Sequence, residues 1–141
     1  MFVVKILTAG KCKDAYLLEV SSAYEKRLKP YAQNRWVVSK TDDDLAQLVA
    51  KEPSYVCLDL AVKMYDSPTF SKTLFTLLEK ENSRITFVIG GFEGLDSNLV
   101  KNSLFSICLS PLTFTSQMVR LIFLEQLYRA FQIQLNKKYH R

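Results

Sequence analysis

Glycine, cysteine and histidine are all scarce in this chain of 141 residues, which contains four glycines, three cysteines and one histidine. The cysteines, Cys12, Cys57 and Cys108, are odd in number and show no C-x-x-C spacing, so neither a disulfide framework nor a zinc site is indicated. We expect them to behave as small buried hydrophobes, since Cys57 and Cys108 fall within apolar runs.

Long hydrophobic runs are also missing. No run approaches the roughly 20 apolar residues that a membrane-spanning helix needs. The N-terminal stretch lacks the basic flank, apolar segment and small-residue cleavage site that together mark a secretory signal. We therefore expect a cytoplasmic protein that needs no membrane.

The chain does contain enough apolar sequence to build a core, with 48% hydrophobic and 23% charged residues. A chain of this length and composition most simply forms one domain, which we place at residues 1–141. The formal net charge of +5 is compatible with a polyanionic partner, although many basic proteins bind no nucleic acid.

Short apolar runs alternate with helical patterns along the chain. The runs predict five β-strands, at residues 2–7, 35–39, 55–60, 84–89 and 104–109. Apolar spacing of three and four residues predicts helices between and after them, ending before Pro30, before Pro53, near Lys80, near Asn102 and near Leu135. The expected N-caps include Asp14, Thr41 and Ser67, with Pro68 at the first helical position.

This alternation implies parallel strands joined by crossover helices, and hence an α/β sheet covered on both faces. Such sheets bind ligands beyond the carboxyl ends of their strands. The segments of interest therefore follow the third, fourth and fifth strands: "DLAVKMYDS", "GGFEG" and "SPLTFTS".

Three of the four glycines, Gly90, Gly91 and Gly94, lie within "FVIGGFEGL" at 87–95. The spacing is neither the G-x-G-x-x-G dinucleotide fingerprint nor a phosphate-binding P-loop. Two interpretations remain open: a tight turn that packs a helix close to the sheet, or a loop whose backbone approaches a ligand. The scarcity of glycine elsewhere favours the ligand.

Four segments together resemble one known family: "FVIGGFEGL" (87–95), "LSPLTFT" (109–115), "VRLIFLEQLYRAFQI" (119–133) and the terminal "YHR" (139–141). They are similar to the bacterial ribosomal RNA large subunit methyltransferase H family, whose members are SPOUT methyltransferases. The similarity extends along the whole length, including "LDL..K...S" at 58–67.

The resemblance implies more than the patterns alone. It implies a parallel-sheet α/β domain with a C-terminal trefoil knot, a feature that the general avoidance of knots argues against. It also implies S-adenosylmethionine as cofactor, no metal, a homodimer, and methylation of N3 of a pseudouridine in 23S rRNA within the ribosome.

The family positions for the cofactor fall at the ends of the third, fourth and fifth strands. Backbone groups there would close over the cofactor, and Leu112 with its neighbours would hold the adenine. The residues concerned are Leu58, Gly90, Gly91, Gly94, Ser110, Pro111, Leu112, Thr113, Phe114 and Thr115.

A second set of family positions implies a group on the substrate side: Arg129, Tyr139, His140 and Arg141. Arginines suit phosphate and carbonyl contacts, a tyrosine can stack on a base, and His140 is the candidate general base. Without the family, the basic tail would be interpreted as a solvated terminus and Arg129 as a residue near a helix C-terminus.

The sequence departs from the family at several places. Thr115 and Ser116 stand where a proline and a histidine are usual ahead of Arg120, Lys137-Lys138 replaces a His-Pro pair, and Val62 replaces a glycine. The alternative function is therefore a non-catalytic module that binds RNA or the ribosome and retains the fold. In a dimer, the apolar helix at 115–135 is the expected interface, bringing one chain's basic tail to the other's cofactor loop.

Overall fold

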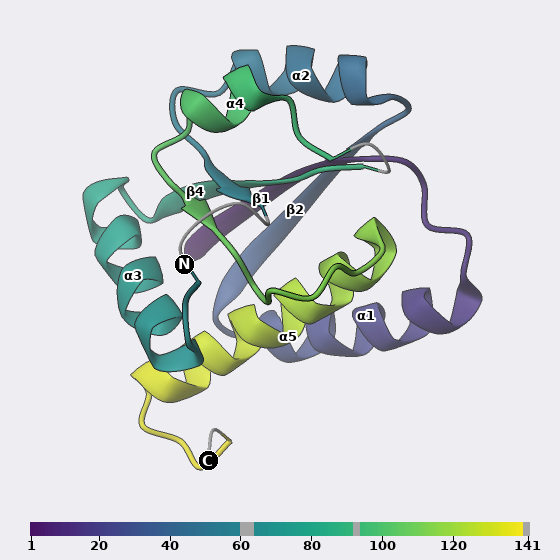
Figure 1. Cartoon of the computed structure of the whole chain (residues 1–141). Helices are drawn as coiled ribbons and strands as arrows, with labels where there is room; N and C mark the ends of the chain where they lie inside the picture. Colours follow the sequence, from purple (N-terminus) through teal and green to yellow (C-terminus); the bar gives the residue numbers. More distant parts are fainter. Residues whose placement is uncertain (60–63, 92–93, 140–141) are drawn as a thin grey trace.

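The computed structural model describes residues 1–59, 64–91 and 94–139. Strands and helices alternate along these residues, as Figure 1 shows. The strands are β1 (Phe2–Ala9), β2 (Ala32–Ser39), β3 (Val56–Leu58), β4 (Arg84–Ile89) and β5 (Ser106–Ile107). The helices are α1 (Ala15–Leu28), α2 (Asp42–Ala50), α3 (Ser67–Lys80), α4 (Ser97–Lys101) and α5 (Ser116–Gln134).

The strands form one parallel sheet in the order β2-β1-β4-β3-β5. β1 pairs along its whole length with β2, from Phe2 opposite Ala32 to Ala9 opposite Ser39, and with β4 on its other side. Because all strands run in one direction, their carboxyl ends meet at a single edge of the sheet. The predicted parallel α/β sheet is confirmed.

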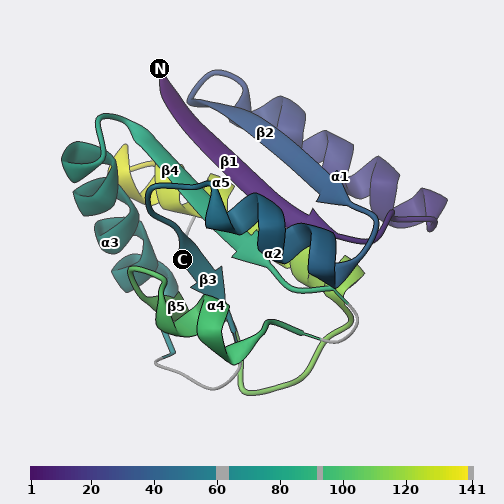
Figure 2. The ribbon, with the colours of Figure 1, turned by 90° about the horizontal axis from the view of Figure 1, so that it is seen from above.

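Helices cover both faces of the sheet. Figures 1 and 2 show α1, α3 and α5 on one face and α2 with α4 on the other. Alternate residues of β1 serve two cores: Val4 and Ile6 belong to the core beneath α3 and α5, whereas Leu7 and Ala9 belong to the core beneath α2 and α4. The sheet is thus buried on both sides, which explains its near-continuous apolar strands.

Helix caps follow the sequence at most positions. The side chains of Asp14, Thr41 and Thr115 accept hydrogen bonds from the first turns of α1, α2 and α5. The prediction of Ser67 as the cap of α3 is wrong by one residue, because Asp66 Oδ1 accepts from the Thr69 amide at 2.8 Å. Ser67 is the first helical residue, and its hydroxyl donates instead to Gln126 of α5.

Two strands are shorter than predicted. β3 spans only 56–58 and β5 only 106–107, against the expected 55–60 and 104–109. β5 has β3 as its neighbour on one side and lies at the edge of the sheet, so little pairing defines it. β1 and β2, which pair over eight residues, are longer than predicted.

Other expectations met mixed outcomes. Cys57 and Cys108 are buried, as predicted, whereas Cys12 is only half-buried in the loop between β1 and α1. Within the described ranges, no helix is both long and apolar enough to cross a bilayer. Phe123 and Leu127 of α5, the helix predicted at 115–135, are fully buried in the core on the α3 and α5 side of the sheet.

Candidate functional site

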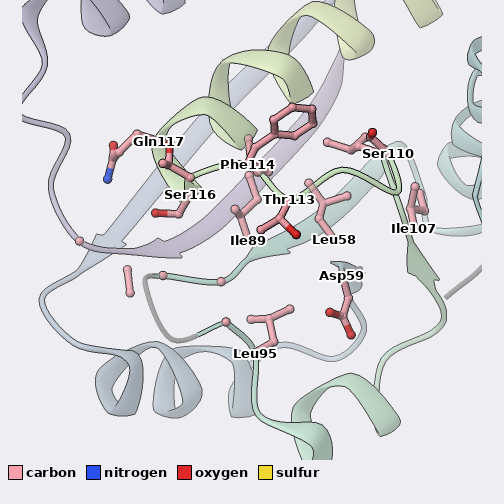
Figure 3. Close-up of a pocket in the computed structure, with 18 of the residues that line it drawn as sticks. Leu58, Asp59, Ile89, Leu95, Ile107, Ser110, Thr113, Phe114, Ser116 and Gln117 are labelled. Carbon is pink, nitrogen blue, oxygen red and sulfur yellow. The ribbon is translucent and has the colours of Figure 1, made fainter. Parts of the chain in front are cut away.

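A cavity of about 770 Å³ opens at the carboxyl edge of the sheet, within the roughly 300–1,000 Å³ typical of small-molecule sites. Its walls come from the ends of β1, β3, β4 and β5, from the 109–115 segment and from the first turn of α5. Figure 3 shows Leu58, Ile89 and Ile107 at the strand ends, with Thr113 and Phe114 beside them. The cavity therefore lies where parallel α/β sheets bind ligands.

This cavity brings together nine of the ten residues that the resemblance assigns to the cofactor. Pro111 is not part of the lining and is exposed in the same segment. The nine are Leu58, Gly90, Gly91, Gly94, Ser110, Leu112, Thr113, Phe114 and Thr115.

Two of the clustered glycines, Gly90 and Gly91, have neighbours that leave no room for a side chain. A Cβ on Gly90 would lie 2.8 Å from the carbonyl carbon of Gly94, and a Cβ on Gly91 would lie 2.6 Å from Oδ1 of Asp42. Gly94 has φ of +79°, a conformation that L side chains rarely adopt. Contacts within the chain thus account for Gly90 and Gly91, backbone conformation accounts for Gly94, and all three glycines line the cavity.

Asp42, the first residue of α2, holds this turn from outside. Its Oδ1 accepts a hydrogen bond from the Gly91 amide at 3.3 Å. The sequence gives no sign of the contact, because 49 residues separate the two positions. The wall of the cavity is therefore tied to the start of α2.

The loop after β5 is shaped by its own side chains. Ser110 Oγ accepts from the Leu112 amide at 3.1 Å, and the Cys108 thiol donates to the Ser110 carbonyl oxygen at 3.0 Å. Leu112, expected to hold an adenine, is 66% exposed at the rim of the cavity. An apolar side chain at this position is available to a ligand that enters the cavity.

Sequence reasoning missed two parts of the lining: the end of β1 and the first turn of α5. Ala9 and Gly10 line the cavity because β1 lies between β2 and β4 in the sheet, a placement that the order of strands along the chain does not reveal. Ser116 and Gln117 also line the cavity, so the departure at Ser116 falls within the site itself.

Arg120 joins these two parts. Its side chain is buried, and its Nη2 donates to the carbonyl oxygens of Ala9 at 2.7 Å and Gly10 at 2.6 Å. Burial lowers the pKa of Arg120, yet a guanidinium remains charged at neutral pH. Arg120 lies four residues after Ser116 in α5, and residues at this spacing share one side of a helix. This spacing is the sequence signal that points to Arg120.

The described part of the substrate-side group gathers around Glu125. Arg129 forms an ion pair with Glu125 at 2.6 Å, and Tyr139 Oη donates to the same carboxylate at 3.1 Å. Hydrogen bonding to Glu125 raises the pKa of Arg129, and burial together with Tyr24 and Glu125 raises the pKa of Tyr139. Both groups therefore keep their protons at neutral pH. His140 and Arg141 lie outside the described residues.

Lys137, one of the two lysines that stand where the family has a His-Pro pair, contacts Tyr31 in the loop between α1 and β2. Lys137 Nζ lies 5.6 Å from the ring centroid of Tyr31 and donates to its hydroxyl at 3.2 Å. Hydrogen bonds with Gln132 and Lys137 lower the pKa of Tyr31. Lys138 is exposed, and Val62 lies outside the described residues.

The two predicted groups are far apart within one chain. Arg129 follows Ser116 by 13 residues in α5, which corresponds to about 20 Å along a helix axis. The cavity lies at the N-terminal end of α5, and Arg129 with Tyr139 lies near its C-terminal end.

A parallel α/β sheet with a small-molecule cavity at its carboxyl edge defines a cofactor- or nucleotide-binding class of protein. A family model described as "Predicted SPOUT methyltransferase" matches residues 2–140. Ribosomal RNA large subunit methyltransferase H of Protochlamydia amoebophila (strain UWE25) is 39% identical over 141 residues, which cover all of both chains. The chain belongs to the SPOUT methyltransferase family.

Solved structures share the fold at low identity. A probable methylase family protein from Haemophilus influenzae Rd KW20 has a TM-score of 0.59 and 11% identity, covering 98% of this chain and 70% of its own. A putative methyltransferase from Legionella pneumophila, solved with bound SAM, has a TM-score of 0.52 and 10% identity, covering 92% of this chain and 66% of its own.

Proposed function

We propose that this methyltransferase uses S-adenosylmethionine to methylate N3 of a pseudouridine in 23S rRNA of assembled ribosomes. The observation that carries the proposal is the match of residues 2–140 to the SPOUT methyltransferase family. The name of the Protochlamydia relative supports rRNA as substrate, and the pseudouridine N3 target rests on the resemblance to that family.

The cavity suits S-adenosylmethionine in size and chemistry. Apolar side chains such as Leu58, Ile89 and Ile107 offer a surface for the adenosyl group, and the backbone of 109–115 offers donors and acceptors. Asp59 also lines the cavity, and its carboxylate suits a cofactor that carries a positive charge. The bound cofactor in the Legionella neighbour supports the same assignment.

The cofactor, when bound, supplies an activated methyl group. The chain's own work is to align the nucleotide for in-line attack and to accept the weakly acidic imide proton. We assign alignment to Arg129, Tyr139 and Arg141 and the proton to His140. A neutral Tyr139 can present its ring to a base, since its raised pKa keeps the phenol protonated.

The distance between the two groups supports a homodimer with shared sites. Arg129 lies about 20 Å along α5 from the cavity of its own chain, too far for one nucleotide to contact both. A symmetric pair would instead bring one chain's Arg129 and Tyr139 to the partner's cavity. We place the interface on α5, where Met118 is exposed.

We also propose that residues 1–141 form one domain with a C-terminal trefoil knot. The resemblance supports the knot, and the cores on both faces of one sheet support a single domain. Stretching the protein by its two ends tests the knot, because an unknotted chain of 141 residues extends to roughly 490 Å. A knot would leave the stretched chain measurably shorter, and full extension would contradict it.

The function is tested by calorimetry with S-adenosylmethionine, followed by methyl transfer to 70S ribosomes and mapping of the product. Thr113→Trp, an exposed position in the lining, fills the cavity, and Thr76→Trp on the exposed side of α3 is the matched control. We expect binding and transfer for wild type and the control, and loss of both for Thr113→Trp. Tight ribosome binding without cofactor affinity would instead support the non-catalytic module.

A further inference from the structure

One carboxylate oxygen organises the described part of the substrate-side group. Glu125 Oε1 accepts hydrogen bonds from Arg129 Nε at 3.1 Å, Arg129 Nη2 at 2.6 Å and Tyr139 Oη at 3.1 Å. The guanidinium therefore meets the carboxylate through two of its donors, which fixes its plane as well as its position. Tyr139 is fixed by the same atom, although it lies 14 residues away along the chain.

The second oxygen of Glu125 is held in turn. Oε2 accepts from Gln126 Nε2 at 2.7 Å, and Gln126 Oε1 accepts from Ser67 Oγ at 2.7 Å. Ser67 begins α3, directly after the segment that follows β3. A continuous chain of hydrogen bonds thus runs from the start of α3 across α5 to the C-terminal tail.

Ring contacts complete the arrangement. The Arg129 guanidinium lies 4.9 Å from the ring centroid of Tyr139, and the rings of Tyr128 and Tyr139 meet edge to face at 5.0 Å. The side chains of Arg129 and Glu125 are 24% and 20% exposed, so solvent screens their interaction less than it screens a fully exposed pair.

We propose that Glu125 is a positioning residue that holds Arg129 and Tyr139 in the orientation needed to receive the RNA nucleotide, with Gln126 and Ser67 orienting Glu125. This inference rests on the proposed function. A solvated pair at i and i+4 contributes little and is replaceable. Glu125 differs because two partners from separate segments depend on one oxygen. Its carboxylate also supplies the charge that pairs with Arg129 and a second acceptor oxygen for Gln126.

The test variant is Glu125→Gln, which keeps the shape but loses the charge and one acceptor. Glu79→Gln on the exposed side of α3 is the matched control. We expect kcat/KM on 70S ribosomes to fall about 100-fold for Glu125→Gln, the cost of misplacing a positioning group, with cofactor affinity and Tm near wild type. Glu79→Gln should retain wild-type kinetics.

Testing Glu125→Gln in a protein that already carries Arg129→Ala distinguishes a positioning role of Glu125 from a general loss of structure. In an Arg129→Ala protein, Glu125→Gln should lower kcat/KM much less than it does in wild type, because its main target is already gone. Glu125→Asp, which keeps the charge, should recover part of the loss. A full, independent 100-fold loss in the Arg129→Ala background would overturn the proposal.

A spectroscopic readout works without methyl transfer. The Nε–H signal of Arg129 in ¹H–¹⁵N spectra, assigned by its disappearance in Arg129→Lys, should exchange slowly with water in wild type and rapidly in Glu125→Gln. Unchanged exchange would overturn positioning by Glu125 even in an active enzyme. Slow exchange in a protein that transfers no methyl group would overturn the proposed function, and with it the role of Glu125 in catalysis.

Discussion

The guanidinium of Arg120 donates to the carbonyl oxygen of Gly10 at 2.6 Å, although 110 residues separate them. The contact fastens the first turns of α5 to the end of the interior strand β1. Both segments line the cavity, so the hydrogen bonds of Arg120 set the width of this part of the site.

Replacing Arg120 by methionine should therefore damage stability and cofactor binding together. The variant leaves the carbonyl oxygens of Ala9 and Gly10 without their donor, and we expect the free energy of unfolding to fall by about 2 kcal/mol. Urea unfolding and calorimetry measure the two effects. Arg35→Met, at an exposed position of β2, is the control. Undiminished cofactor affinity in Arg120→Met would show that the clamp does not shape the site.

Gly91 and Asp42 should show strong coupling. Gly91→Ala places a Cβ against Asp42 Oδ1 and should lower the free energy of unfolding by about 1–3 kcal/mol. Adding Asp42→Ala removes that clash, so the double variant should be more stable than the sum of the single effects predicts. The remaining neighbour, Ala9 Cβ at 3.2 Å, limits the recovery.

A double-mutant cycle by urea unfolding measures this coupling. Additive effects would mean that the loop moves away from Asp42 freely. Gly90→Ala is the contrasting variant, because its obstacle is the backbone of Gly94 and no side-chain deletion relieves it.

The buried thiol of Cys57 predicts a loss of stability at alkaline pH. Burial raises its pKa from 9.0 to about 11. Below pH 9 the thiol is protonated in both states, and its contribution to stability is fully present. Above pH 9 the unfolded chain ionises first, so the free energy of unfolding should fall between about pH 9 and 11, by roughly 2–3 kcal/mol.

The measurement compares wild type with Cys57→Ala over this pH range. Tyr139, whose pKa is raised by burial, Tyr24 and Glu125, contributes equally to both proteins and cancels in the difference. The pKa of Tyr55 is raised by burial and by the charge of Cys57, so the part that comes from Cys57 is lost with the thiol. Parallel pH profiles for the two proteins would contradict the assignment to Cys57.

Shared sites predict complementation between two impaired variants. Thr113→Trp fills the cavity, and Arg129→Ala removes a substrate-side contact, so each protein alone should keep only a small residual activity. After mixing and subunit exchange, about one quarter of wild-type activity should return, since half of the dimers are mixed and each of these holds one intact site. Sites built within one chain would recover nothing on mixing.

Local sequence signals predicted the helices and strands well. The features that the sequence did not predict depend on contacts between residues that are distant in the chain. The strand at 84–89 and the caps Asp14 and Thr41 follow from short-range chemistry and are confirmed. The cap of α3 failed because Asp66 precedes Ser67, whose hydroxyl has a partner 59 residues away.

The site followed the same division. The strand ends and the glycine loop were predicted to lie together because parallel strands place their carboxyl ends at one edge, and they line one cavity. The family resemblance supplied the loop after β5. The roles of Asp42, Arg120 and Glu125 could not be predicted. Each of these roles depends on a contact with a residue of another segment. The strand order and the path of the C-terminal tail bring those segments together.

α5 sets the spacing between the cavity and the substrate-side group. Its first turn lines the cavity and its later turns carry Glu125 and Arg129. One residue inserted between Ser116 and Glu125 would lengthen this spacing by only about 1.5 Å but rotate Arg129 by about 100° about the helix axis. The phase of this helix, more than its length, therefore determines where the substrate-side group points.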